Sequence, residues 1–139
     1  MAGYSGTPLA QKLGIKAGVT VVVINSPDNY RSLLGKFAND AKFSNRVTTN
    51  SNFIHFFTKH RSELKRQLHR LRSKMAEAAT LWVSWPKKSS GISTDITEDV
   101  IRAVALPLGF VDIKVCAVDE VWSGLKLVIR RSERSTTTK

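Results

Sequence analysis

The chain has 139 residues, 42% of them hydrophobic, so it can bury one substantial core and has little room for a second domain. No apolar stretch approaches the roughly 20 residues that span a bilayer, and the N-terminus lacks the basic-then-apolar order of a secretory signal, so we expect a cytoplasmic protein. Lys and Arg number 22 against 11 Asp and Glu, and the net charge of +11 favours anionic partners.

Apolar periodicity and turn residues predict strands and helices that alternate along the chain. Thr7-Pro8 and Gly14 bracket a short opening helix, and residues 19–25 (VTVVVIN) form a near-continuous β-branched run that is typical of a buried strand. The elements predicted for the first half are a helix at 7–14, a strand at 19–25, a short helix at 29–36, a weak strand near 46–49 and a strand at 52–59.

The strongest helix signal lies in residues 59–74, where leucines three or four positions apart share one stripe and the basic residues point away. The elements predicted after it are a strand at 80–86, a loop at 87–93, a helix at 98–108 and two antiparallel strands at 110–118 and 125–131. Trp82 and Trp85 lie three residues apart in a strand, so they face opposite sides of the sheet. We expect one to fill the core and the other to line the sheet edge.

This order of elements is the one that an α/β sheet with right-handed crossovers produces. The predicted fold class is therefore α/β, as a single three-layer domain over residues 1–131 whose Rossmann-like sheet ends in a C-terminal antiparallel strand pair. Residues 132–139 form a polar tail with nothing to bury, and we expect disorder there.

The turn after the first predicted strand, Ser26-Pro27-Asp28-Asn29-Tyr30, contains no glycine. Nucleotide-binding α/β proteins carry a glycine-rich turn at this place, because only a residue without Cβ lets backbone amides close on a phosphate or a ribose. Only 26 residues separate this strand from the next strong one, and no acidic residue is placed after a second strand to hold a ribose. We therefore predict no nucleotide cofactor.

A helix ending at Gly109-Phe110, a strand, a short connection and a final strand ending at Arg130-Arg131 close the chain. This layout, over residues 52–131, resembles the back half of class I, S-adenosylmethionine-dependent methyltransferase-like folds. The resemblance implies a shortened sheet in which the last strand inserts antiparallel beside its neighbours. Because the glycine-free turn departs from that pattern, we predict no tight binding of the methyl donor.

Six short segments, which together are distributed over most of the chain, form a specific set. They are GYSGTPL at 3–9, KLGIK at 12–16, LWVSWPKK at 81–88, TDITED at 94–99, KVCAVDE at 114–120 and WSGL at 122–125. As a set they are similar to a family of small bacterial proteins of unknown function, a resemblance that implies a fold and no particular reaction.

Ligands of open α/β sheets bind beyond the carboxyl ends of the strands, so the candidate ligand-binding residues are those that follow each predicted strand. They are Asn25, Ser26, Asp28, Lys59, Trp85, Lys87, Lys88, Ser89, Asp119, Glu120 and Trp122. Lys87 and Lys88 offer two cations beside small hydrogen-bond donors, where an anionic small molecule could dock. Alternatively, these lysines belong to an ordinary strand exit and pair with Asp95, Asp119 or Glu120.

The basic charge is concentrated in residues 59–74, which hold seven Lys or Arg, two His and a single acid, Glu63. A field of that sign attracts nucleic acid or acidic lipid head groups. The residues predicted to bind a polyanion are Lys65, Arg66, Arg70 and Lys74. The alternative is a solvated face that only keeps a small protein soluble. No aromatic residues interleave with the basic ones, which argues against recognition of single strands by stacking.

Nucleophilic and metal chemistry have weak support. Cys116 is the only cysteine, which excludes an internal disulfide, and its strand predicts a buried or half-buried small side chain. His55, His60 and His69 show no metal-ligand spacing, so neither a metal nor a cofactor is predicted. The chain has no G-x-S-x-G elbow and no G-x-x-x-x-G-K loop.

We interpret the sequence as that of a non-catalytic interaction or ligand-binding protein on a degenerate methyltransferase-like fold. One alternative is a nucleic-acid or polyanion binder that uses the helix predicted at 59–74. Another is a small enzyme or anion-binding protein that uses the strand carboxyl edge near Lys87.

Overall fold

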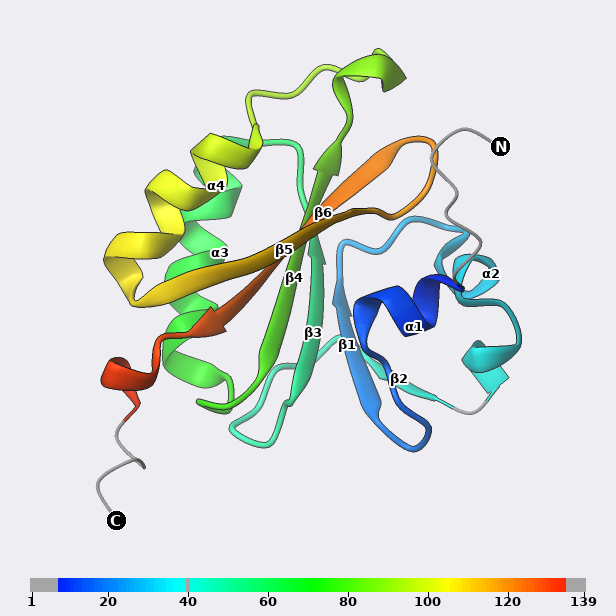
Figure 1. Cartoon of the computed structure of the whole chain (residues 1–139), viewed down its shortest axis with the longest axis horizontal. Helices are drawn as coiled ribbons and strands as arrows, with labels where there is room; N and C mark the ends of the chain where they lie inside the picture. The colour runs from blue at the N-terminus through cyan, green and yellow to red at the C-terminus, as the bar shows by residue number, and fades with distance from the viewer. Residues whose placement is uncertain (1–7, 40, 135–139) are drawn as a thin grey trace.

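A six-stranded sheet in the order β2-β1-β3-β4-β6-β5 forms the centre of the structure, a computed structural model that describes residues 8–39 and 41–134 (Figure 1). The first four strands in this order are parallel, whereas β6 is antiparallel to both of its neighbours. The predicted α/β class and the antiparallel strand pair at the C-terminus are therefore confirmed. The strands are β1 Thr20–Ile24, β2 Lys42–Ser44, β3 Phe53–Phe57, β4 Thr80–Pro86, β5 Phe110–Ala117 and β6 Trp122–Ile129.

Helices connect the strands, and the capping residues set where two of them begin and end. Gly14 ends α1 with a φ of 83°, a left-handed conformation that glycine adopts at low cost. Thr97 precedes α4, and its Oγ1 accepts a hydrogen bond from the amide of Val100 at 3.2 Å. The α-helices are α1 Leu9–Leu13, α2 Tyr30–Leu34, α3 Arg61–Lys74 and α4 Glu98–Ala105, and the short 3-10 helices are η1 Gly35–Asn39, η2 Lys88–Ser90, η3 Leu106–Leu108 and η4 Arg131–Glu133.

The sheet is covered on both faces, which makes three layers: α3 and α4 pack on one face and α1 and α2 on the other (Figure 1). Leu64, Leu68 and Leu71 of α3 are fully buried against the sheet, as the leucine stripe predicted. On the opposite face Trp82 is fully buried, and its indole Nε1 donates a hydrogen bond to the carbonyl of Leu13 at 2.9 Å. This bond fixes α1 to the centre of the sheet.

Some predicted elements differ from the structure. The weak strand near 46–49 is wrong: the second strand is β2, three residues long, and it forms because its backbone pairs with β1 and Phe43 packs on the ring of Tyr30. The last strand begins at Trp122, earlier than 125, since this residue already pairs with Pro86. Trp82 and Trp85 do face opposite sides, but Trp85 does not line the sheet edge, because it is only 8% exposed and belongs to the core beneath α3 and α4.

The C-terminal end of the described chain packs against α3. Glu133 of η4 lies 3.8 Å from the guanidinium of Arg72, and the Nε of Arg134 donates to the carbonyl of Ile129. Residues 135–139 of the predicted tail, and Thr7 of the predicted opening helix, lie outside the described residues. No helix within the described ranges combines the length and the apolar character that crossing a membrane requires.

Candidate functional site

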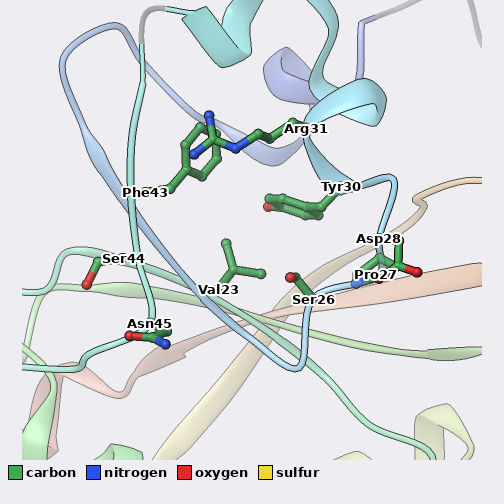
Figure 2. A pocket seen from close by; sticks show the side chains of 9 residues that line it. All are labelled: Val23, Ser26, Pro27, Asp28, Tyr30, Arg31, Phe43, Ser44 and Asn45. Atoms are coloured by element: carbon green, nitrogen blue, oxygen red, sulfur yellow. The ribbon is translucent and has the colours of Figure 1, made fainter.

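A pocket of about 720 Å³ opens at the carboxyl ends of β1 and β2 (Figure 2). We call it the β1–β2 pocket, and its lining residues are Val23, Ser26, Pro27, Asp28, Tyr30, Arg31, Phe43, Ser44 and Asn45. Its volume lies within the range of small-molecule sites, and it occupies the edge at which open α/β sheets bind ligands. Ser26 and Asp28 are the only members of the predicted ligand-binding set that line it.

The turn that forms one wall of this pocket offers few amides to a ligand. Asn25 ends β1 with a φ of 58°, a left-handed conformation that asparagine tolerates better than most residues. Pro27 has no amide hydrogen, and the amide of Tyr30 is already bonded to the carbonyl of Pro27 at 3.1 Å. Two of the five positions of the turn therefore offer no free amide, whereas a glycine-rich turn holds a phosphate with a row of them.

Tyr30 lies across the inner end of the pocket and is 3% exposed. Its hydroxyl is turned inward, where it shares a hydrogen bond of 2.8 Å with Nδ1 of His55. The other ring nitrogen, Nε2, shares one of 2.7 Å with the hydroxyl of Ser84. Tyr30 therefore presents its ring to the pocket. Behind it, Tyr30, His55 and Ser84 form a buried chain of hydrogen bonds from α2 through β3 to β4.

Burial controls the ionisation of this chain. It lowers the pKa of His55 to about 3 and raises the pKa of Tyr30 above its ordinary value. Both side chains are thus neutral across the physiological range. Neither is poised near neutral pH, so neither is suited to act as a general acid or base for a molecule in the pocket.

Arg31 supplies a positive charge at the rim. Its guanidinium carbon lies 4.3 Å from the centre of the Phe43 ring, a cation–π arrangement that orients the planar group (Figure 2). Among the described residues, no salt bridge joins Arg31 to a carboxylate. Figure 2 shows Ser44 and Asn45 on the same side of the pocket as Phe43, and Ser26 and Asp28 on the opposite side. One cation, Arg31, one carboxylate, Asp28, and several neutral hydrogen-bonding groups therefore surround a common space.

The predicted site residue Asn25 joins strand ends and does not line the pocket. Its Nδ2 donates to the carbonyl of Phe57 at 3.1 Å and to Oε2 of Glu63 at 3.0 Å. The hydroxyl of Thr58 donates to the other oxygen of Glu63 at 2.6 Å. These bonds tie the ends of β1 and β3 to the first turn of α3, so Asn25 is structural in this arrangement.

The predicted residue Lys59 follows β3, and the loop before α4 fastens the chain beside it. The carbonyl of Lys59 accepts a hydrogen bond from the hydroxyl of Thr94 at 2.7 Å. Asp95 accepts one from the amide of Arg61 at 2.7 Å, which satisfies a free donor of the first turn of α3. Asp95 is thus a helix-capping residue, and the Lys59 side chain stays exposed.

Lys87, Lys88 and Ser89 lie at and after the end of β4. None of the salt bridges in the described part of the chain involves either lysine, so the alternative in which they pair with an acid is wrong for these residues. Asp119 instead closes the turn before β6, where its Oδ1 accepts hydrogen bonds from the amides of Val121 and Trp122. Asp119 is therefore a turn-forming residue.

The remaining predicted residues of this edge are dispersed. Trp85 is in the core, Glu120 is exposed, and Trp122 packs edge-on against Phe57 with ring centres 5.0 Å apart. The structure therefore does not bring the predicted set together around one pocket.

Cys116 is half-buried, as expected, and burial raises the pKa of its thiol. No cluster of three or more potential metal-ligating side chains occurs among the described residues.

The sequence prediction missed most of the pocket. Phe43, Ser44 and Asn45 are not among the candidates because the second strand is predicted four residues too late, and Tyr30 and Arg31 are not because they belong to α2 and do not directly follow a strand. One signal was available: Phe43 is an isolated aromatic residue in a polar stretch, and such a residue can mark a short strand that packs on a neighbour.

Comparisons with known proteins agree on the fold. No protein-family model matches the chain, and no curated protein sequence does. Among solved structures, a proposed type 11 methyltransferase from Sulfolobus solfataricus matches with a TM-score of 0.63 at 14% identity, over 94% of this chain and 95% of that one. A SAM-dependent methyltransferase from Aquifex aeolicus matches with a TM-score of 0.63 at 13% identity, over 87% of each chain.

The mitomycin 7-O-methyltransferase MmcR also matches, with a TM-score of 0.56 at 11% identity, over 88% of this chain and 53% of that one. Identities this low show a shared fold and leave activity open. The chain therefore has a methyltransferase-like Rossmann fold, shortened to a six-stranded sheet.

Proposed function

We propose that this protein is a non-catalytic binding protein for a small anionic molecule, a carboxylate or a phosphate ester with a flat or apolar body, held in the β1–β2 pocket. The observation that carries the proposal is the guanidinium of Arg31, oriented over Phe43 at the rim of a pocket of about 720 Å³. A planar guanidinium can donate two parallel hydrogen bonds to a carboxylate or a phosphate.

The rest of the pocket suits the body of such a ligand. Tyr30 and Phe43 offer ring surfaces, and Val23 adds apolar contact. Ser26, Ser44 and Asn45 can donate or accept hydrogen bonds without adding charge. This combination of apolar walls and a few polar groups is the usual composition of a small-molecule site.

Two features support binding without methyl transfer. The turn at residues 26–30 lacks glycine and offers few free amides, and β2 ends in Ser44-Asn45, where no carboxylate is available for a ribose. In addition, burial keeps Tyr30, which lines the pocket, and His55 behind it neutral. Membership of the small bacterial family, a cytoplasmic location and an anion site near Lys87 stay predictions of the sequence.

Calorimetry with phenyl phosphate, benzoate and the uncharged analogue benzamide tests the proposal. The two anions should bind and benzamide should not, and Arg31→Gln should weaken anion binding about ten-fold or more, since it removes a charge-assisted pair. Arg46→Gln is the matched control, because Arg46 is exposed and does not line this pocket. Micromolar binding of S-adenosylmethionine, or anion binding that is unchanged in Arg31→Gln, would contradict the proposal.

A further inference from the structure

The outer face of α3 carries positive charge that forms no salt bridge within the described residues. Five Lys or Arg residues and one histidine make up what we call the α3 basic face: Arg61, Lys65, Arg66, His69, Arg70 and Lys74. All are exposed except Arg70, which is half-buried and whose Nε donates to Gln67 on the same helix. No salt bridge joins any of them to an acid among the described residues.

The fold removes the acids that could neutralise this face. Glu63 is the only acid of α3, and its carboxylate is turned toward the sheet edge, where it accepts hydrogen bonds from Asn25 and Thr58. Arg72 is the α3 cation that does have a role in packing, since its Nε donates to the carbonyl of Leu108 and its guanidinium lies near Glu133. Within α3, the face thus carries basic side chains and no carboxylate.

The neighbouring helix has the opposite character. Glu98 and Asp99 of α4 and Asp112 of β5 gather around Arg102. Because three carboxylates share one guanidinium, this group of side chains carries a net negative charge. The cations of α3 are therefore flanked on this side by acidic side chains.

We propose that the α3 basic face docks on the phosphate backbone of a nucleic-acid duplex. Arg66, Arg70 and Lys74 follow one another at four-residue intervals, so they form a row about 12 Å long at 1.5 Å of rise per residue. A DNA duplex carries one phosphate per roughly 1.7 Å of its axis, so about seven phosphates lie within that length. Each cation of the row has a phosphate within reach.

The composition of the helix selects this partner over two others. An amphipathic helix binds a membrane through an apolar face, but the apolar face of α3 is packed on the sheet, and none of the large exposed hydrophobic residues of the described chain lies on α3. Recognition of single strands uses aromatic side chains for stacking, and α3 contains no Phe, Tyr or Trp. Backbone contacts carry no base readout, so the binding is independent of sequence.

Fluorescence anisotropy with a labelled DNA duplex of 24 base pairs tests the proposal. Affinity should fall by more than ten-fold between 50 and 200 mM KCl, because bound phosphates release counterions. The triple variant Arg66→Gln, Arg70→Gln, Lys74→Gln should bind at least ten-fold more weakly and show a salt slope smaller by two to three, close to one for each lost phosphate contact.

A matched control removes the same charge elsewhere. Lys16, Lys36 and Lys42 are exposed, and none of them lies on α3 or α4, so their triple substitution by Gln should leave duplex affinity within about three-fold. Circular dichroism confirms that both variants remain folded. Equal losses in the two variants, tighter binding of the single strand, or binding of phosphatidylserine vesicles without binding of the duplex would each overturn the proposal.

Discussion

The hydroxyl of Tyr30 lies 2.8 Å from Nδ1 of His55, which is itself fully buried and bonded through Nε2 to Ser84. This pair couples the helix behind the β1–β2 pocket to the centre of the sheet. Both ring nitrogens of the histidine are satisfied without a charge, so the interior contains a polar chain at little cost.

Replacing Tyr30 by Phe keeps the ring contacts with Phe43 and Phe57 and removes one hydrogen-bonding group. Since Nδ1 of His55 is then buried without a partner, we expect a loss of about 1–3 kcal/mol in the free energy of unfolding. Urea denaturation measures it. Ser84→Ala should produce a loss of the same order, because it leaves Nε2 of His55 without a partner. Wild-type stability in both variants would show that these two hydrogen bonds contribute nothing to the free energy of unfolding.

The pH dependence of stability has a sign that follows from His55. Burial lowers its pKa to about 3, below the 6.5 of an unfolded chain, so between these values the unfolded state binds more protons than the folded state. The contribution of His55 is complete above about pH 6.5 and is lost as the pH falls toward 3, at up to about 1.4 kcal/mol per pH unit.

Two measurements check this expectation. The slope of the unfolding free energy between pH 4 and 6 should be shallower in His55→Gln than in the wild type and than in the variant His69→Gln, which replaces an exposed histidine. If His55→Gln fails to fold, NMR of the wild-type imidazole nitrogens replaces it: the signals of His55 should not move between pH 7 and 4.5. A His55 that titrates near pH 6 contradicts the account.

Asn25→Asp places a second carboxylate beside Glu63, because the substituted Nδ2 lies 3.0 Å from Oε2 of that residue. We expect a lower melting temperature at pH 7 and a smaller difference at pH 4, where one of the two carboxylates takes up a proton. Asn25→Gly is the control, since it keeps the left-handed conformation and loses the same hydrogen bonds without adding charge. Equal pH dependence in the two variants would show that the carboxylates do not interact.

Gly124→Ala should destabilise the sheet although the position is not in a left-handed conformation. A Cβ there would lie 3.2 Å from Cε3 of Trp82 and 3.3 Å from Oγ of Ser84, closer than ordinary packing allows. We expect a cost of about 1–3 kcal/mol, measured by urea denaturation, because these neighbours are fully buried. Ser123→Ala, at the adjacent position of β6, should cost less than the glycine substitution does.

The sequence predicts the fold better than the pocket, for physical reasons. β1, β3 and β4 are buried on both faces, so they are nearly continuous apolar runs, and the leucines of α3 repeat with the period of a helix. β2 has only the residues Lys42, Phe43 and Ser44, too few for any period to emerge, and it forms through pairing with β1.

The pocket also depends on contacts between distant parts of the chain. The helical position of Tyr30 is visible in the sequence, but its bond to His55, 25 residues away, is not. The candidate residues Asp119 and Asn25 follow strands as expected, yet both are engaged in hydrogen bonds that only the structure reveals. Asp119 accepts them within its own turn, and Asn25 donates to Phe57 and Glu63, 32 and 38 residues away. The predicted order of strands can therefore locate the carboxyl edge of the sheet, but only the structure shows which side chains on that edge are free to contact a ligand.

Mapping phenyl phosphate on the folded protein by amide chemical-shift changes tests the proposed binding site most directly. The account predicts that the shifted amides centre on Ser26, Arg31, Ser44 and Asn45 and that the phenyl phosphate concentration giving half of the shift rises about ten-fold or more in Arg31→Gln. Shifts that centre on Lys87 to Ser90, or an equally tight response of residues 26–30 to S-adenosylmethionine, would contradict it.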